Sequence, residues 1–541
     1  MKKTTIAILA ALMLAASMLM VSCTSFSERP NGNRPNDNDD VITIKVLDND
    51  VFLKSSDELT DPTSDYYDPR WEYICNEFKV RFEYVPVNYS TWADQVRIMI
   101  NTDSLPDVAV ASLPSPSEYQ KYASQGIIKS LPEDYAEKYP NIAKNIEAVT
   151  ARDAFIYDGK YIAIPRSLDM GGKTTDYTYQ FIYNKKWAVD AGVAVKDAYT
   201  LEELYDMFTK VQAAHPNALM YNSIQPNMIF QLGIYQYVDA FYEKPKDNFT
   251  INKDGTSYEW VAARPEFLEG LKWTKRFYDA GFVHKEYTTL PMYEARTEFA
   301  TGKTFSYYDG SDINFFCTTV RDGFVQQNPG KEFSDNVDVA LILSNDGKYM
   351  ERDLGNYWSE IFFNSKIKDY VYERFLQVYD FLCSEEGQFM HVFGMPGKDY
   401  TKDADGNVQT LRQINPETGL YNQFNLKVSD GYMMVYHGPV EGTSIHQNNP
   451  SLDAKARDRI AHLFNLKAVG PTIKTPYDSK LKAYDSRDFN AFTGDPYKQM
   501  NMIITTSKDE NEAVAKWQEF VNSNKAGADA VIKELNEQLL K

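Results

Sequence analysis

Side chains that often carry catalysis are sparse in this chain and show no familiar catalytic spacing. The 541 residues include 6 histidines, and no two of them have the spacing of a helix-borne zinc site. Tyr436-His437-Gly438 and Ser444-Ile445-His446 lack the pattern of a nucleophile elbow. No glycine-rich phosphate-binding loop occurs. Acidic residues are plentiful, so a glycosidase carboxylate pair stays open, although nothing marks a particular pair.

Metal binding is also weakly indicated. Asp399–Asn407 (DYTKDADGN) has some likeness to a calcium loop, but the frame that begins at Asp403 lacks glycine at its sixth position and a closing Glu. A hairpin turn around Asp405-Gly406 is the favoured interpretation. The four cysteines show neither a metal-ligand spacing nor a disulfide framework: Cys23, Cys75, Cys317 and Cys383. We therefore expect no metal and no cofactor.

Net charge and composition limit the kinds of molecule that this protein can bind. A net charge of −19 argues against nucleic acid, which requires a basic surface. Aromatic residues make up 14% of the chain, with 38 Tyr and 7 Trp. Such side chains suit sugar rings, and equally an ordinary amphipathic surface. The length favours two domains with a large core.

The chain begins with features of an export signal. Lys2 and Lys3 precede the apolar run Ile6–Val21, which is short for a membrane span. Met20-Val21-Ser22-Cys23 resembles the lipobox of bacterial lipoproteins, with Met20 where Leu is usual, and this resemblance implies lipidation of Cys23. The alternative is a plain secretory signal. We expect a signal peptide at 1–22 and a polar, disordered tether at 23–40.

Strands and helices alternate after the tether. Val41–Leu47, Val80–Val87 and Leu105–Ala111 have the patterns of strands, and helical spacing follows each of them, which predicts a parallel sheet covered by helices. In open sheets of this kind, ligands bind beyond the carboxyl ends of the strands. Ser112 and Ser115 stand there and are candidate contacts, while Ser117 is an alternative helix N-cap. Asp65, in the Asp-rich loop before the second strand, is a further candidate.

Phe155–Trp187 is interpreted as a crossing between two lobes. Two aromatic runs, Tyr161–Ile164 and Tyr179–Tyr183, have the character of strands and are separated by a segment rich in Gly, Asp and Thr. Pro165 ends the first run, because proline cannot donate to a sheet ladder. Arg166 follows it and is a candidate ligand contact. An ordinary hairpin within one domain is the alternative interpretation.

Several segments, taken in order, resemble a known family. They are LPDVAVASLPSPSEYQKYASQGIIKSL, DGKYIAIPR, FIYNKKW and TLEELYDMFTKV. Their order over most of the chain, behind a lipobox, is similar to the extracellular solute-binding proteins of bacterial ABC importers. The most similar cluster is the carbohydrate-binding one that includes maltose-binding-type proteins. The resemblance implies an α/β, periplasmic-binding-protein-like fold: two α/β lobes joined by a multi-strand hinge, with a ligand cleft between them.

The resemblance also implies site residues in the later part of the chain. Thr304–Ser311 is similar to the family strand that passes back to the first lobe, which makes Tyr308, Asp309 and Ser311 candidate contacts. Asp309-Gly310 alone could be only a hairpin turn. Tyr235 is a further candidate in a segment that faces the cleft in the family, with core packing as the alternative. Trp358, in the third expected crossing, would be a stacking platform for a sugar.

These expectations combine into one organisation and one function. The first lobe would hold 41–165 plus 306–353 and the second 178–303 plus 360–541, with hinge crossings at 164–180, 304–310 and 353–360. The expected function is that of a monomeric, lipid-anchored, extracytoplasmic protein, not an enzyme, which captures an oligosaccharide and delivers it to ABC permease subunits. The alternatives are a secreted glycan-degrading enzyme and an adhesion or scaffold lipoprotein.

Overall fold

The computed structural model describes most of the chain after the predicted tether. The described residues are 40–48, 54–88, 91–113, 115–168, 179–238, 241–242, 244–291, 293–310, 312–352, 355–414, 445, 449–470, 472–475 and 477–540. Within these ranges, no helix combines the length and the apolar character needed to cross a bilayer. The cysteines in these ranges are free and buried: Cys75, Cys317 and Cys383.

The first sheet has the strand order β2-β1-β3-β16-β4, with β7 also paired to β16. β1 runs parallel to both β2 and β3, whereas β16 is antiparallel to β3, β4 and β7. The predicted opening strands are confirmed to within a few residues. The strands are β1 (Ile42–Asp48), β2 (Val80–Pro86), β3 (Val108–Ala111), β4 (Ile128–Lys129), β7 (Ile164–Ser167) and β16 (Tyr357–Asn364).

Helices cover this sheet and enclose one apolar core. Trp71 and Phe375 are fully buried in that core, which combines the early part of the chain with a much later one. Burial of such large apolar side chains supplies the main driving force for the lobe. The contributing helices are α3 (Pro69–Glu77), α4 (Trp92–Asn101), α5 (Pro116–Ser124), α7 (Pro140–Ala148), α15 (Asp369–Cys383) and α16 (Glu385–Phe393).

The second sheet has the order β10-β13-β8-β14-β9. β8 is antiparallel to both of its neighbours, and β10 and β9 extend the sheet in parallel with β13 and β14. The strands are β8 (Tyr179–Asn184), β9 (Ala198–Thr200), β10 (Leu219–Ser223), β13 (Thr304–Gly310) and β14 (Val337–Leu343).

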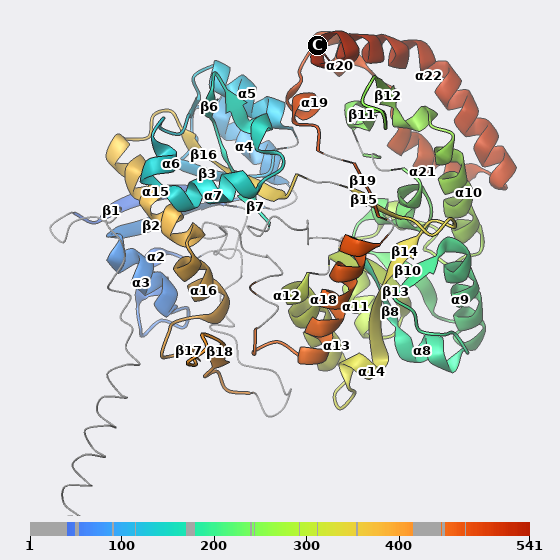
Figure 1. The fold of residues 1–541 in the computed structure, drawn as a ribbon, viewed down its shortest axis with the longest axis horizontal. Helices are drawn as coiled ribbons and strands as arrows, with labels where there is room; N and C mark the ends of the chain where they lie inside the picture. The colour runs from blue at the N-terminus through green and yellow to red at the C-terminus, as the bar shows by residue number, and fades with distance from the viewer. Residues whose placement is uncertain are drawn as a thin grey trace, which may run out of the picture.

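Long helices build the second core. α9 (Leu201–Ala214) begins with a capping box, in which the side chains of Thr200 and Glu203 bond reciprocally to backbone N–H groups. α10 (Glu266–Asp279) packs against the C-terminal helix α22 (Glu510–Leu539), where the rings of Phe267 and Trp517 stack with centroids 4.4 Å apart. Figure 1 shows these elements as a second body beside that of the first sheet.

The strand pairings correct the predicted lobe boundaries. β7 and β16 belong to the first sheet whereas β8 and β14 belong to the second, and the crossings at 164–180 and 353–360 stay predictions. The crossing at 304–310 is wrong: β13 is paired on both edges, to β10 and β8, so it stays within the second sheet. The assignment of 306–353 to the first lobe is therefore wrong for β13 and β14.

The assignment of 360–541 to the second lobe is also wrong in part. β16, α15 and α16 pack in the first core, whereas α18 (Ala454–Val469), later in the chain, packs in the second body. The hairpin β17 (Tyr400–Lys402)–β18 (Val408–Thr410) follows α16 and packs against it. The sequence pattern shows strands but not their pairing partners, which is why the two bodies were divided incorrectly.

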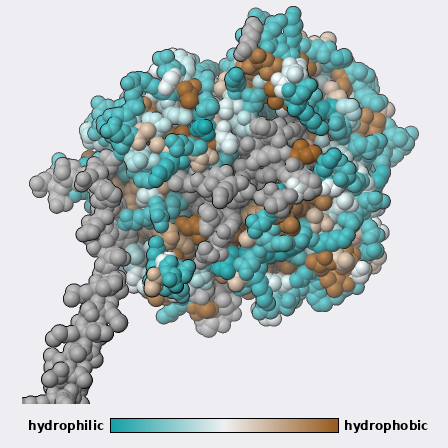
Figure 2. Space-filling view, viewed as in Figure 1, coloured by the Kyte–Doolittle hydropathy of each residue, from teal (hydrophilic) through white to brown (hydrophobic). Residues whose placement is uncertain are grey.

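A short C-terminal segment contacts both bodies. α19 (Ser479–Ala483) packs against α5 and the 3₁₀ turn η2 (Arg152–Phe155) of the first body, and against α22 of the second. Lys482 accepts a hydrogen bond of 3.0 Å from the hydroxyl of Ser115 through its carbonyl, while its ammonium lies 3.4 Å from the carboxylate of Asp247. The face of the molecule in Figure 2 is mainly hydrophilic, with scattered apolar residues.

Candidate functional site

The first half of the candidate site lies where the first sheet gives way to the crossings. Tyr357, the first residue of β16, pairs with Ser167, the last residue of β7, and the register then shifts before Glu360. Asn356 and Ser359 have φ of 55° and 63°. Asn adopts left-handed backbone readily, but for Ser359 this conformation is strained, and such strain clusters at functional sites. This irregular strand end carries Trp358.

Trp358 contacts the ring of Trp92 and the guanidinium of Arg166. The rings of Trp92 and Trp358 meet edge to face with centroids 6.1 Å apart, and the guanidinium of Arg166 lies 5.4 Å from the Trp358 ring. The indole N–H of Trp92 donates to the carbonyl of Val110 at 2.9 Å, which fixes that ring against β3. Trp358 is half-buried, so part of its ring stays accessible. We name Trp92, Arg166 and Trp358 the first-lobe cluster.

A buried carboxyl group supports this cluster. Glu360 is 1% exposed and accepts a hydrogen bond of 2.6 Å from the hydroxyl of Tyr119, which is itself fully buried. Burial raises the pKa of Glu360 to about 8, against the lowering effects of the Tyr119 hydrogen bond and the charge of Arg166. Near neutral pH this carboxyl group is therefore mostly protonated.

The second half of the candidate site lies at the carboxyl end of β13. Asp309, 1% exposed, accepts two hydrogen bonds from Arg296, at 2.7 Å from Nε and 3.2 Å from Nη2. Burial raises the pKa of Asp309 although Arg296 lowers it. Asp309 pairs with Gln180 on β8, so it lies beside the start of the strand that follows the first crossing. We name Arg296 and Asp309 the second-lobe pair.

Comparison with known proteins decides the family. Residues 75–350, about half of the chain, match the model of the family described as bacterial extracellular solute-binding protein. The chain belongs to this family. A search of curated proteins finds no match.

Solved structures confirm the fold of this solute-binding protein. It is similar to the alginate-binding protein AlgQ2 without calcium ion, with 16% identity, a TM-score of 0.63, and coverage of 94% of this chain and 99% of that one. It is also similar to the N-glycan transport solute binding protein NgtS from Streptococcus pneumoniae in complex with Man1GlcNAc, with 14% identity, a TM-score of 0.59, and coverage of 92% and 98%. The predicted periplasmic-binding-protein-like fold of two α/β lobes is thereby confirmed.

Arg166 and Trp358, both expected in hinge crossings, lie together at the end of the first sheet. Ser112 directly follows β3 and is half-buried, and Asp65 is exposed in the loop before α3. Ser115 is the N-cap of α5, the role considered for Ser117, and its hydroxyl also binds the hydroxyl of Ser117 at 2.8 Å. Contact of Asp65, Ser112 and Ser115 with a ligand stays a prediction.

Two of the candidate contacts in the second lobe are buried in its core. Tyr235 is 4% exposed on the 3₁₀ turn η4 (Ile234–Gln236), and its hydroxyl donates to the carbonyl of Phe241 at 3.3 Å. Tyr308, 5% exposed on β13, belongs to the same core. Both rings are packed in the core, which was the alternative interpretation for Tyr235, and their contact with a ligand stays a prediction. Ser311 and the lipidation candidate Cys23 lie outside the described residues.

Sequence reasoning missed three members of the site. Glu360 stands in an aromatic strand, YWSEIFF, and a lone charged residue in an apolar strand was the available signal. Arg296 and Trp92 gave none, because each lies on an amphipathic helix whose partner strand is not visible in the sequence. The part of the chain that the structure describes contains no group of three or more His, Cys, Asp or Glu side chains placed to hold a metal ion.

The region with some likeness to a calcium loop forms the predicted hairpin. β17 pairs antiparallel with β18, and the carboxylate of Asp403 accepts hydrogen bonds from the backbone N–H groups of Asp405 and Asn407 at 3.0 and 2.8 Å. These bonds occupy the carboxylate with the turn itself, which is the usual role of Asp at such a position.

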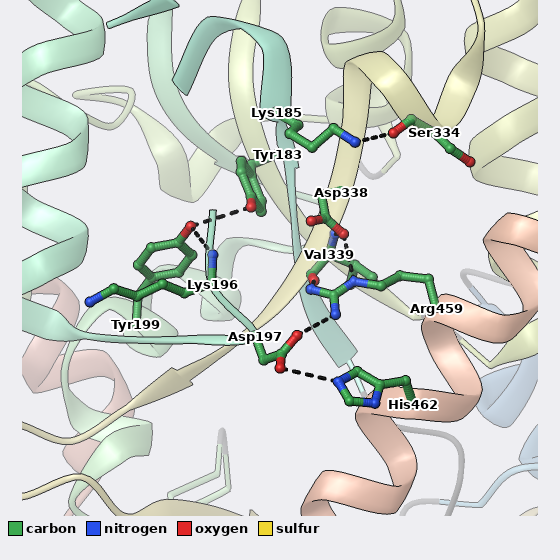
Figure 3. A network of polar contacts seen from close by, with 10 residues as sticks. All are labelled: Tyr183, Lys185, Lys196, Asp197, Tyr199, Ser334, Asp338, Val339, Arg459 and His462. Atoms are coloured by element: carbon green, nitrogen blue, oxygen red, sulfur yellow. Dashed lines mark hydrogen bonds and ion pairs between the residues drawn. The ribbon is translucent and has the colours of Figure 1, made fainter. Parts of the chain in front are cut away.

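A separate polar network holds α18 against the second sheet. Figure 3 shows Arg459 of α18 reaching the carboxylates of Asp197 and Asp338, while His462 approaches Asp197 at 3.1 Å. Partial burial acts to raise the pKa of Asp197, but the hydrogen bonds from Arg459 and His462 lower it overall. Asp338 lies at the start of β14 and pairs with Tyr183 near the end of β8, whereas Asp309 pairs with Gln180 near its start. The network therefore holds α18 in place rather than forming part of the candidate site.

Proposed function

We propose that this solute-binding protein captures an oligosaccharide between its two lobes and delivers it to the permease of an ABC importer. One observation carries the proposal: each lobe holds a buried charged group beside the same crossing, Arg166 in the first and Asp309 in the second. Arg166 lies one residue before the end of β7, and Asp309 pairs with Gln180 near the start of β8. A ligand held at this crossing would contact both the first-lobe cluster and the second-lobe pair.

The chemistry of the two groups suits a sugar. The accessible part of the Trp358 ring can stack on the C–H face of a pyranose, and Arg296, whose side chain is 31% exposed, has N–H groups left to donate to hydroxyls. We propose Ser112, Arg166, Asp309 and Trp358 as ligand contacts, with Arg296 added to the predicted set. Sugar ligands accompany similar folds: NgtS with Man1GlcNAc and a FusA EF-hand mutant from Streptococcus pneumoniae with fructo-nystose, the latter at 14% identity and a TM-score of 0.57.

The proposed mechanism is binding and closure, without a chemical reaction. A ligand that touches both lobes binds the closed arrangement better than the open one, so it shifts the population toward closure, and the permease recognises that state. Two crossings with described ends, between β7 and β8 and between β15 (Tyr349–Arg352) and β16, would serve as the hinge. We further propose that Cys23 carries the lipid that anchors a monomeric protein outside the cytoplasm.

A thermal-shift screen tests the proposal. The mature protein would be incubated with neutral and acidic oligosaccharides, monosaccharides, amino acids and peptides, because a ligand that binds only the folded state must raise Tm. We expect one class of oligosaccharide to raise Tm without any product after long incubation. A rise accompanied by glycan cleavage would contradict the binding role in favour of an enzyme, and a response to peptides alone would overturn the sugar.

A further inference from the structure

Tyr293 adopts a backbone conformation that its residue type disfavours. Its φ of 67° and ψ of −1° place it in the left-handed region, directly before α11 (Glu294–Ala300). Gly, Asn and Asp occupy this region readily, whereas a bulky aromatic residue there is an outlier. Tyr293 also provides no side-chain hydrogen bond to cap α11. Neither the turn nor the helix therefore gains from a tyrosine at this position.

Local contacts nevertheless hold Tyr293 firmly. Its backbone N–H donates to the carbonyl of Ile224, the residue after β10, at 3.2 Å, and its carbonyl accepts from the N–H of Arg296 at 3.2 Å. The guanidinium of Arg296 lies 4.5 Å from the centroid of the Tyr293 ring. Because Asp309 fixes Arg296 by two hydrogen bonds, the ring is positioned by a chain of contacts that begins in the second-lobe pair.

The ring remains accessible in this position. Tyr293 is 38% exposed, although the tyrosines around it on β13, Tyr307 and Tyr308, are buried. A guanidinium can cover only one face of an aromatic ring, so this exposure leaves other ring surface open. Phe315, half-buried, lies on the same guanidinium at 4.8 Å from its ring centroid. We name Tyr293, Arg296 and Phe315 the Tyr293 shelf.

We propose that the Tyr293 shelf is a sugar-binding subsite of the second lobe, in which the Tyr293 ring stacks on the C–H face of a pyranose. The inference rests on the proposed function and adds a subsite that faces the carboxyl ends of β10 and β13. A strained, exposed and rigidly held aromatic residue costs stability, and binding is the use that its geometry fits. Arg296 would donate from its remaining N–H groups to the hydroxyls of the same sugar.

Two substitutions separate binding from folding. Tyr293→Asn removes the ring and places at φ 67° a residue that tolerates this conformation, so the unliganded protein should keep or raise its Tm. Tyr293→Phe retains the ring and loses only the hydroxyl. The matched control is Tyr157→Asn, since Tyr157 of β5 (Ile156–Tyr157) in the first lobe has the same exposure of 38%. Affinity for the oligosaccharide found in the screen would be measured by titration calorimetry.

The expected result is at least a tenfold loss of affinity in Tyr293→Asn, a change below threefold in Tyr293→Phe, and none in Tyr157→Asn. Unchanged affinity in Tyr293→Asn while the wild type binds would overturn the subsite and leave the proposed function intact. A lower Tm of the unliganded Tyr293→Asn protein with unchanged affinity would assign the ring a structural role and also overturn the proposal. A wild type that binds no oligosaccharide would overturn the proposed function, and the subsite with it.

Discussion

The hydroxyl of Tyr119 donates a hydrogen bond of 2.6 Å to the carboxyl group of Glu360, and both side chains are buried where β16 meets β3. Glu360 lies two residues beyond Trp358 and close to the charge of Arg166. The first-lobe cluster therefore rests on a carboxyl group that is mostly protonated near neutral pH, which links the candidate site to pH.

Stability should fall with rising pH because of Glu360. Burial raises the pKa of this group from 4.5 to about 8, so the folded state holds a proton that the unfolded chain releases. The contribution of this proton to the free energy of unfolding is complete below about pH 4.5, declines above it, and is lost once the pH passes about 8. The total loss is on the order of a few kcal/mol. We expect Glu360→Gln, which mimics the protonated form, to match the wild type at pH 5 and to have the higher Tm at pH 8.5.

Calorimetry at several pH values would check this expectation. Glu83→Gln on β2 is the control, because its side chain is 56% exposed, and its Tm difference from the wild type should not change with pH. A constant difference between Glu360→Gln and the wild type from pH 5 to 8.5 would show that Glu360 does not titrate as described.

Loss of the Asp309 carboxylate should destabilise the second lobe. Asp309→Asn removes the charge that pairs with Arg296 and leaves a partly buried guanidinium poorly compensated, at a cost of about 3 kcal/mol. Urea unfolding would measure the change. Asp190→Asn, at the exposed pair of Lys186 and Asp190, should cost less than about 0.5 kcal/mol. Equal effects of the two substitutions would argue against a structural role for the second-lobe pair.

Removal of the Trp358 ring should weaken ligand binding more than folding. Trp358 is half-buried and contacts Trp92 edge to face, so Trp358→Ala should lower the affinity for oligosaccharide at least tenfold through loss of stacking. Trp358→Phe keeps an aromatic face and should recover most of the affinity. Titration calorimetry would compare both variants, and wild-type affinity in Trp358→Ala would remove this residue from the site.

The predicted lipid anchor depends on one group, the thiol of Cys23. Replacing Cys23 by Ala should block acylation and move the protein from the detergent-rich to the aqueous phase in a Triton X-114 partition. The buried Cys75→Ala variant is the control and should stay in the detergent-rich phase. Retention of Cys23→Ala in that phase would require another anchor.

The sequence predicted elements better than it predicted their partners. Alternation of apolar residues located β1 to within one residue, because alternation reflects the burial of one strand face. Pairing is a property of distant segments. Thr304–Gly310 was therefore assigned to a crossing, although β10 and β8 flank it on both sides.

In the candidate site, too, some residues could be predicted from the sequence whereas their interaction partners could not. Arg166 and Trp358 could be predicted because both lie at the ends of strands next to crossings, where ligands bind in such folds. Glu360 and Arg296 could not, since their roles come from Tyr119 and Asp309, which folding alone brings to them. Tyr293 is recognised only from its backbone angles and its exposure, and the sequence around it predicts neither of them.

Hydrogen–deuterium exchange with and without the bound oligosaccharide tests the central claim, that one ligand contacts both lobes, most directly. We predict slower exchange in two separate segments at once: 355–360 with 164–168 in the first lobe, and 293–310 in the second. The hairpin β17–β18 should exchange at an unchanged rate. Slower exchange confined to one lobe, or located at this hairpin, would contradict capture between the lobes.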